Sequence, residues 1–257
     1  MERNDLRHIR GLLADMDGVW FVDDRPIPGA GDALAALRAR GLPLRLVTNT
    51  TTRTRAQLAE RMRRMGLGVA EHEIVNSPTA AVHHLRARGV RRVRLVVSDA
   101  IAGEFAEFET STAPEVIVMG DIGERWDYRL MSELFHQVLG GAGIVALHKG
   151  RYWQVGDGLA LDIGAFVAGL EYATGKTATV IGKPSPQMYR AALADLGLAA
   201  RDVVMIGDDI HHDVAGAQAA GIRGVLVKTG KYREDLVARS GVVPDLVIES
   251  IADLARV

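Results

Sequence analysis

Four short segments of the chain hold acidic, hydroxyl and basic side chains, and each lies at the end of an apolar run. They are LADMDGV at 13–19, VTN at 47–49, GKP at 182–184 and GDDIHHD at 207–213. Together they supply several carboxylates, a hydroxyl at Thr48 and an ammonium at Lys183. Carboxylate oxygens suit a hard cation such as Mg²⁺, and an ammonium beside a hydroxyl suits phosphoryl oxygens. The segments therefore predict a site that holds a phosphoryl group against a divalent cation.

The chemistry of a phosphate monoester explains why these side-chain types belong together. The ester is dianionic and repels nucleophiles, so an attacking carboxylate needs a cation that offsets the charge. A lysine and a hydroxyl hold the non-bridging oxygens, because positioning and charge stabilisation supply most of the catalysis in phosphoryl transfer. Attack by a carboxylate forms an aspartyl phosphate and splits the displacement into two steps. A second carboxyl, protonated at the right moment, donates its proton to the leaving group.

Composition limits the kinds of protein that this chain can be. Its 257 residues are 48% hydrophobic, with a formal net charge of -1, which predicts a globular fold with one or two cores. The balance of 31 basic against 32 acidic side chains gives no field that would steer the chain toward nucleic acid or anionic lipid. The absence of cysteine excludes disulfides, thiolate metal sites and a cysteine nucleophile. The lack of cysteine is compatible with a cytoplasmic location, which we predict. Asp15 and Asp17 interrupt the first apolar stretch, so we expect neither a signal peptide nor a membrane span.

Short apolar runs alternate with segments of helical periodicity along most of the chain. The runs that predict strands are 11–14, 44–47, 93–97, 116–119, 144–147, 203–206 and 224–227. The segments that predict helices are 30–40, 55–65, 79–88, 129–139, 163–173, 185–196 and 213–220. This alternation favours parallel sheets packed against helices, which is the α/β class with a doubly wound, Rossmann-like core.

The spacing of the motifs predicts a second domain inserted into the first. The stretch between Thr48 and Lys183 is far longer than one crossover connection needs, and it has strands and helices of its own. We place an inserted α/β cap domain at 77–180 and build the core from 1–76 and 181–257. Neighbouring parallel strands would then bring the four segments to their carboxyl ends, in the crevice where open α/β sheets bind ligands.

The four segments resemble the signature set of haloacid dehalogenase (HAD) superfamily phosphatases. Asp15-Met16-Asp17-Gly18 matches the first motif, Thr48 the second, Lys183 the third, and Gly207-Asp208 through Asp213 the fourth. The long insertion resembles the α/β cap of subfamily IIA, the branch that includes NagD-like nucleotide and sugar phosphatases. Within this branch the chain is most similar to the phospholysine phosphohistidine inorganic pyrophosphate phosphatase group, through GRY at 150–152, GLALDIG at 158–164, LEYA at 170–173, GKPSP at 182–186 and KTGK at 228–231. The resemblance covers nearly the whole chain.

The resemblance implies a role for each acidic residue of the motifs. Asp15 would be the nucleophile and a metal ligand through its carboxylate. Asp17 would be the general acid and base, and would give its backbone carbonyl to the metal. Asp208 would complete the Mg²⁺ site, and Asp213 would support these ligands from behind, paired with Lys183.

The resemblance also implies which residues hold the phosphoryl group. Thr48 and the backbone amide of Asn49 would bind phosphoryl oxygens. Lys183 would neutralise the phosphoryl charge and orient Asp15. Gly18 and the segment 19–28 would form a mobile turn and flap next to the nucleophile.

Several polar residues in and near the motifs have a purely structural interpretation as well. Asp209 either supports the metal ligands from behind or caps the helix that follows. His211 and His212 lie between two acids, but adjacent residues on a helix point apart, which favours solvated side chains over a transition-metal site. A group of arginines favours a solvated helix face over a nucleic-acid site, because the whole chain is nearly neutral. These arginines are Arg53, Arg55, Arg61, Arg63 and Arg64.

Substrate choice is expected to lie in the cap, because the core motifs contact only the phosphoryl group. The candidates are polar residues on cap segments that resemble those facing the core in relatives, namely His148, Lys149, Arg151, Tyr152 and Asp162. Cap motion would exclude water and set access. The resemblance also implies a homodimer formed through the cap.

The functional prediction is a Mg²⁺-dependent phosphatase that hydrolyses small phosphorylated metabolites through an aspartyl phosphate on Asp15. An alternative keeps the same core but cleaves a P–N or P–O–P bond, as in phosphohistidine, phospholysine or pyrophosphate. The group most similar to the chain lacks a carboxylate at the position of Asp17, and the acid present here suits an alkoxide leaving group. An alternative of another class is a phospho-accepting signalling module or a non-catalytic phosphate-binding protein. Such a phospho-accepting module is far shorter and needs no inserted cap.

Overall fold

The structure, a computed structural model, describes residues 9–155 and 158–256. The chain divides into two compact units. The first unit holds the described residues up to Thr48, Arg55–Val75 and the described residues from Lys183 onward, and the second holds Asn49–Thr54 and Asn76–Gly182. The segment 49–54 is the main difference from the predicted insert at 77–180, because it groups with the second unit although core residues flank it in the chain.

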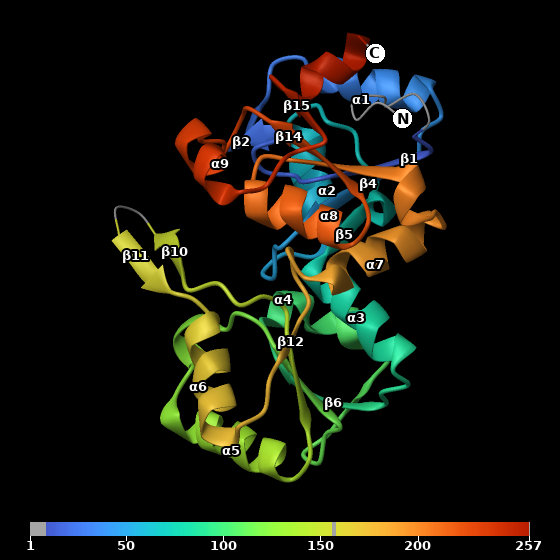
Figure 1. The fold of residues 1–257 in the computed structure, drawn as a ribbon. Helices are drawn as coiled ribbons and strands as arrows, with labels where there is room; N and C mark the ends of the chain where they lie inside the picture. Colours follow the sequence, from blue (N-terminus) through green and yellow to red (C-terminus); the bar gives the residue numbers. More distant parts are fainter. Residues whose placement is uncertain (1–8, 156–157, 257) are drawn as a thin grey trace. The chain divides into compact units, whose positions relative to one another are not determined.

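A six-stranded sheet in the order β15-β14-β13-β1-β4-β5 forms the centre of the first unit (Figure 1). Its strands are β1 (Gly11–Ala14), β4 (Leu44–Thr48), β5 (Ile74–Asn76), β13 (Val203–Gly207), β14 (Arg223–Val227) and β15 (Leu246–Ile248). β1 pairs in parallel with both β13 and β4, and β13 pairs in parallel with β14. Every residue of β1 and β13 is buried, as expected for a parallel sheet covered on both faces, and both strands therefore read as continuous apolar runs.

The α-helices described in the first unit overlap predicted helices, except the last one, which lies where the sequence analysis predicts none. They are α1 (Ala30–Ala39), α2 (Arg55–Arg64), α7 (Pro186–Leu196), α8 (Gly216–Ala219) and α9 (Glu234–Ser240), with short 3-10 segments at Glu71–Glu73, Ala200–Asp202 and Ile251–Arg256. α7 begins where expected, because the Ser185 hydroxyl accepts the N–H of Gln187 and Pro186 occupies the first helical position. The helix predicted at 213–220 differs, since a π-helical turn at Ile210–Ala215 precedes α8.

A short antiparallel hairpin follows the first motif. β2 (Phe21–Val22) pairs with β3 (Arg25–Pro26) through a two-residue turn. Asp23 and Asp24 form the turn with φ angles of 49° and 62°, in the left-handed region that glycine and asparagine favour. Strands of two residues are too short to show an alternating pattern, so the sequence does not predict this hairpin. It lies within the segment that the resemblance assigns to a flap.

The second unit has a five-stranded sheet in the order β12-β9-β8-β6-β7, with each neighbouring pair parallel. Its strands are β6 (Arg92–Val96), β7 (Glu109–Thr110), β8 (Val116–Met119), β9 (Gly143–Ala146) and β12 (Thr179–Val180), and a separate antiparallel hairpin joins β10 (Tyr152–Val155) to β11 (Gly158–Leu161). Its helices are α3 (Ser77–Ala87), α4 (Asp99–Ala102), α5 (Tyr128–Leu139) and α6 (Gly164–Thr174), with 3-10 turns at Gly103–Phe105 and Gly123–Arg125. Both units therefore confirm the predicted α/β class. No helix within 9–155 and 158–256 is long and apolar enough to cross a membrane.

Candidate active site

The first, second and fourth motifs lie at the carboxyl ends of three adjacent strands. β1 ends one residue before Asp15, β13 ends one residue before Asp208, and Thr48 is the last residue of β4. Because β1 lies between β13 and β4, all three side chains come to one edge of the sheet, where open α/β folds bind ligands. All three are buried, although each is polar or charged. Buried polar and charged side chains need hydrogen-bond or charge partners, and the partners of these residues define the candidate site.

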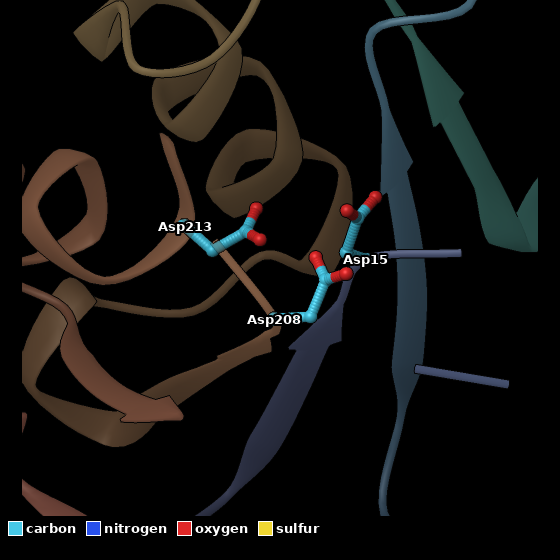
Figure 2. Close-up of side chains that lie close together, drawn as sticks. All are labelled: Asp15, Asp208 and Asp213. Carbon is cyan, nitrogen blue, oxygen red and sulfur yellow. The ribbon is translucent and has the colours of Figure 1, made fainter. Parts of the chain in front are cut away.

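Three carboxylates gather at this edge of the sheet. Oxygen atoms of Asp15, Asp208 and Asp213 lie within 4.8 Å of one another, and Figure 2 shows the three side chains close together. Burial, together with the charge of Asp15, raises the pKa of Asp208 to about 6. Like charges packed so closely away from water favour a bound cation.

Lys183 supplies one of the positive charges that this cluster needs. Its Nζ lies 2.7 Å from Oδ1 of Asp15 and 2.7 Å from Oδ1 of Asp213. Although burial alone would lower it, these two carboxylates raise the pKa of Lys183, so the ammonium keeps its proton. The other oxygen of Asp213 accepts the N–H of Asp209 at 3.1 Å. Burial raises the pKa of Asp213 against the opposing effect of Lys183. With both oxygens engaged, Asp213 is arranged to orient the lysine.

Asp15 and Asp208 present oxygens that suit a hard cation. Oδ1 of Asp208 is buried and accepts no hydrogen bond from any residue that the structure describes. Its Oδ2 accepts the N–H of Lys231 at 2.7 Å, and Oδ1 of Asp15 accepts the N–H of Met16 at 2.8 Å. A buried carboxylate oxygen without a donor is costly unless a cation binds it. The donor set contains only oxygens, which is the ligand type that Mg²⁺ prefers.

Mg²⁺ is expected to raise the melting temperature at about pH 8 and to have little effect at about pH 5. The pKa of Asp208 is about 6 in the folded chain, against the ordinary value of 3.8, so a proton competes with the metal below about pH 6. Without metal, the contribution of Asp208 to stability changes with pH in the opposite direction. Between about pH 4 and pH 6 the folded chain holds a proton on Asp208 that the unfolded chain has lost. The stability that this group contributes should therefore rise as the pH falls from about 6 toward 4.

Thermal unfolding with Mg²⁺ and with chelator, at both pH values, checks this prediction. Asp208→Asn is the matched control, because it removes the titrating carboxylate and should abolish most of the metal effect at either pH. An equal effect of Mg²⁺ on the wild-type chain at both pH values would contradict the assignment of Asp208.

Asp17 lies at the start of the turn that leads into the β2–β3 hairpin. It is exposed, and it forms an isolated bridge with Phe21. Partial desolvation raises the pKa of Asp17, the positive charge of Arg61 opposes this effect, and Asp15 adds to it. A carboxyl whose pKa is raised above its ordinary value holds its proton more readily, which suits a group that gives and takes protons. The use of its backbone carbonyl as a metal ligand stays a prediction.

A loop after β14, for which the motifs predict no role, also borders the site. The Thr229 hydroxyl donates to the carbonyl of Gly18, and the Lys231 N–H donates to Asp208. Gly230 has a φ of 59°, and a Cβ there would collide with the Asp208 carboxylate. Although desolvation opposes the shift, the carboxylates of the site raise the pKa of Lys231. β14 is the neighbour of β13, so its carboxyl end lies at the same edge of the sheet. The rule that ligands bind at the carboxyl ends of strands would therefore predict a role for this loop.

The predicted phosphate-binding residues divide between the two units. Thr48 and Lys183 belong to the first unit, at the sheet edge and in the carboxylate cluster respectively. Asn49 begins the segment 49–54 of the second unit and is partly buried. Its predicted role stays a prediction.

Asp209 caps the π-helical turn and reaches the site only through its backbone. Its Oδ1 accepts the N–H groups of His211 and His212 at 2.9 Å each, and its Oδ2 lies 2.8 Å from Nδ1 of His212. Although burial raises it, these hydrogen bonds lower the pKa of Asp209, and the same contact raises the pKa of His212. Both histidines are exposed, as the sequence analysis favours, and neither joins the carboxylate cluster.

In the second unit, the His148 side chain lies near Asp162, which is two residues before the start of α6. Nδ1 of His148 accepts the N–H of Gly150 at 3.2 Å and lies 3.6 Å from Oδ2 of Asp162. Burial lowers the pKa of His148, although Asp162 opposes this effect. The hydrogen bond from Gly150 and the lowered pKa both favour a neutral imidazole.

The other predicted cap residues are more exposed. Lys149 pairs with Glu171, and Lys149 and Arg151 line a cavity of about 360 Å³ together with the start of α6. Tyr152, the first residue of β10, is 61% exposed. The structure thus gathers His148, Lys149, Arg151 and Asp162 around one helix end, and their role in specificity stays a prediction.

Comparison with known proteins identifies the family of the chain. Residues 12–111 match the family profile described as haloacid dehalogenase-like hydrolase, and residues 180–254 match the profile described as HAD-hydrolase-like. Over 244 residues the chain is 41% identical to haloacid dehalogenase-like hydrolase domain-containing protein 2 of Bos taurus, an alignment that spans 95% of this chain and 93% of that protein. The chain belongs to the haloacid dehalogenase-like hydrolase family. The predicted superfamily is therefore confirmed.

Within the HAD family, several similar proteins are phosphatases. The chain is 36% identical to the human phospholysine phosphohistidine inorganic pyrophosphate phosphatase, over 96% of this chain and 93% of that protein. The p-nitrophenyl phosphatase from Archaeoglobus fulgidus superposes with a TM-score of 0.88 at 31% identity, covering 96% of this chain and 98% of that chain. NagD from E. coli K-12 gives 0.87 at 27% identity, covering 95% and 98%. The chain is thus a HAD phosphatase of the NagD-like subfamily IIA. This result favours an enzyme over the alternative of a non-catalytic module.

Proposed function

We propose that this HAD chain is a Mg²⁺-dependent phosphatase that hydrolyses monoesters of small metabolites through an aspartyl phosphate on Asp15. The main support is the buried ion pair between Asp15 and Lys183, at 2.7 Å, beside an oxygen of Asp208 that accepts no hydrogen bond from a described residue. Asp15 and Asp208 would hold the metal ion, which would offset the negative charge of the phosphoryl group. Asp213 would keep Lys183 in place.

In the first step, a carboxylate oxygen of Asp15 bonds to phosphorus as the bond from phosphorus to the leaving oxygen breaks. Lys183 fixes the direction of attack, because it is held between two carboxylates and has little freedom to move. Thr48, at the end of β4, would bind a phosphoryl oxygen. In the second step, water attacks phosphorus, inorganic phosphate departs and the Asp15 carboxylate is restored.

Asp17 would transfer the protons of both steps. Its carboxyl gives a proton to the leaving alkoxide and later removes one from the attacking water. The raised pKa of Asp17 supports this role, because the shift is in the direction that a proton donor needs. Good leaving groups such as p-nitrophenolate need this proton much less than alkoxides do.

A second candidate has the same core but a different scissile bond. The support is the 36% identity to a protein whose name gives phospholysine, phosphohistidine and inorganic pyrophosphate as substrates. The carboxylate of Asp17 favours phosphate monoesters as substrates, because a poor oxygen leaving group has most need of an acid. The cytoplasmic location and the homodimer formed through the cap stay predictions.

Release of inorganic phosphate from a mixed substrate panel tests the proposal, each substrate with Mg²⁺ and with chelator. The panel contains p-nitrophenyl phosphate, pyridoxal phosphate, phosphoglycolate, sugar phosphates, nucleoside monophosphates, pyrophosphate and phosphohistidine. We expect Mg²⁺-dependent release from at least one class of monoester. Release from phosphohistidine or pyrophosphate alone would favour the second candidate, and release that chelator does not reduce would contradict the metal assignment.

A further inference from the structure

Arg61 differs from Arg63 and Arg64, the two arginines that follow it in α2. Arg63 and Arg64 have side chains that are 73% and 77% exposed, and both pair with Glu60 one turn earlier. The Arg61 side chain is only 25% exposed. The predicted solvated helix face holds for Arg63 and Arg64. Arg61 and Arg55, with side chains 25% and 30% exposed, are partly buried, and Arg61 turns toward the segment after the first motif.

Two contacts join Arg61 to the β2–β3 hairpin. Its Nε donates to Oδ1 of Asp24, and its guanidinium carbon lies 4.5 Å from the centre of the Phe21 ring. A guanidinium at that distance is attracted to the face of an aromatic ring, and more strongly where the pair is shielded from water. Phe21 is 1% exposed, so the contact is shielded on the ring side. Arg61 therefore holds the hairpin at its turn and at its first strand.

The turn that Arg61 holds is costly to form. Asp23 and Asp24 both have positive φ, a conformation that costs free energy for residues other than glycine, although aspartate tolerates it better than most. Two adjacent carboxylates in such a turn also repel one another. The ion pair between Arg61 and Asp24 reduces this repulsion, and without it other conformations of the hairpin become accessible.

The hairpin in turn holds Asp17. The carbonyl of Phe21 accepts the N–H of Gly18 at 2.7 Å, and Asp17 forms a bridge with Phe21. One side chain therefore touches the strand that fixes the backbone of Asp17. All of these residues belong to the first unit.

We propose that Arg61 is a positioning residue for proton transfer, which holds the β2–β3 hairpin so that Asp17 faces the leaving group. The inference rests on the proposed function, because it needs Asp17 to act as the acid. It assigns Arg61 no contact with substrate. Loss of Arg61 should therefore impair the reaction in proportion to how much the leaving group needs a proton.

The test compares kcat/KM for p-nitrophenyl phosphate and for glycerol 2-phosphate, both with Mg²⁺. We use kcat/KM because it reports only the steps up to formation of the aspartyl phosphate, in which the leaving group departs. Arg61→Gln is expected to lower kcat/KM for glycerol 2-phosphate by about 10- to 100-fold and that for p-nitrophenyl phosphate by less than about 3-fold. Asp24→Asn, which keeps the arginine but removes its partner, should give the same pattern with a smaller loss. Arg64→Gln is the matched control on the same helix and should leave both values unchanged.

A double-mutant cycle with Asp17→Ala separates positioning from a general structural effect. Once Asp17 is absent, Arg61→Gln should change kcat/KM for glycerol 2-phosphate by less than about 2-fold, since the two residues act through one step. Equal losses on both substrates, no loss in either variant, or a full loss in the Asp17→Ala background would overturn the role of Arg61. If Arg61→Gln fails to fold, Asp24→Asn alone decides between these outcomes.

Failure of the proposed function has a different signature from failure of this inference. A wild-type chain inactive on both substrates and on every monoester of the panel, or an Asp17→Ala variant as active as wild type on glycerol 2-phosphate, would overturn both. If activity on glycerol 2-phosphate depends on Asp17 but is unchanged by Arg61→Gln, only the inference about Arg61 is overturned.

Discussion

Replacement of Asp15 by Asn is expected to lower Mg²⁺-dependent phosphate release on the order of 10⁴-fold or more, because an amide cannot attack phosphorus. The side chain keeps its shape, and Lys183 keeps its contact with Asp213 at 2.7 Å. The substitution also removes one of three clustered carboxylates, which relieves repulsion in the metal-free chain. We therefore expect the melting temperature to change little or to rise slightly.

Phosphate release and thermal unfolding, measured on the same preparation, check this prediction. Asp32→Asn is the matched control, since Asp32 is an exposed aspartate in the first turn of α1, outside the site. The control should keep full activity. A fully active Asp15→Asn variant would rule out the aspartyl phosphate, and an inactive variant that is also unfolded would show a structural role instead.

Replacement of Lys183 by Met is expected to be the most destabilising of the substitutions considered for this site. The lysine is fully buried between Asp15 and Asp213, and methionine fills similar space without the charge. Removal of one partner of a buried ion pair leaves an uncompensated carboxylate and typically costs about 3–5 kcal/mol. Activity should fall as well, because the phosphoryl charge and the direction of attack both depend on this ammonium.

Chemical denaturation of the metal-free chain measures the stability loss. Lys228→Met is the matched control, because Lys228 pairs with Glu249 on the surface and its loss should have almost no effect. The double variant Lys183→Met/Asp213→Asn should recover part of the lost stability, since it no longer buries the unpaired charge of Asp213. A Lys183→Met variant as stable as the control would contradict the buried ion pair.

Much of the core and its motifs could be predicted because their signals are local. The strands β1 and β13 are buried at every position, so each reads as an unbroken apolar run. The acids that follow them, Asp15 and Asp208, then mark the strand ends where ligands bind. The partnership of Asp213 with Lys183, 30 residues apart, came instead from the resemblance to a family, since spacing alone does not show which side chains meet.

Other parts of the site depend on contacts that no local pattern records. The β2–β3 hairpin has strands of two residues and a turn of two aspartates, the second of which stands where glycine is most common. The segment 49–54 groups with the second unit although the surrounding chain belongs to the first. A helix predicted at 213–220 begins instead with a π-helical turn that Asp209 caps.

The sequence by itself determined the α/β class, the order of the motifs and the side chains available for chemistry, because burial and periodicity act over a few neighbouring residues. Only the tertiary structure decided which charges lie together. It placed Arg61 on the hairpin beside Asp17 and the N–H of Lys231 on Asp208. It also left an oxygen of Asp208 without a hydrogen bond from any residue that the structure describes. These contacts join residues distant in the chain, and the packing of the whole unit determines which of them form.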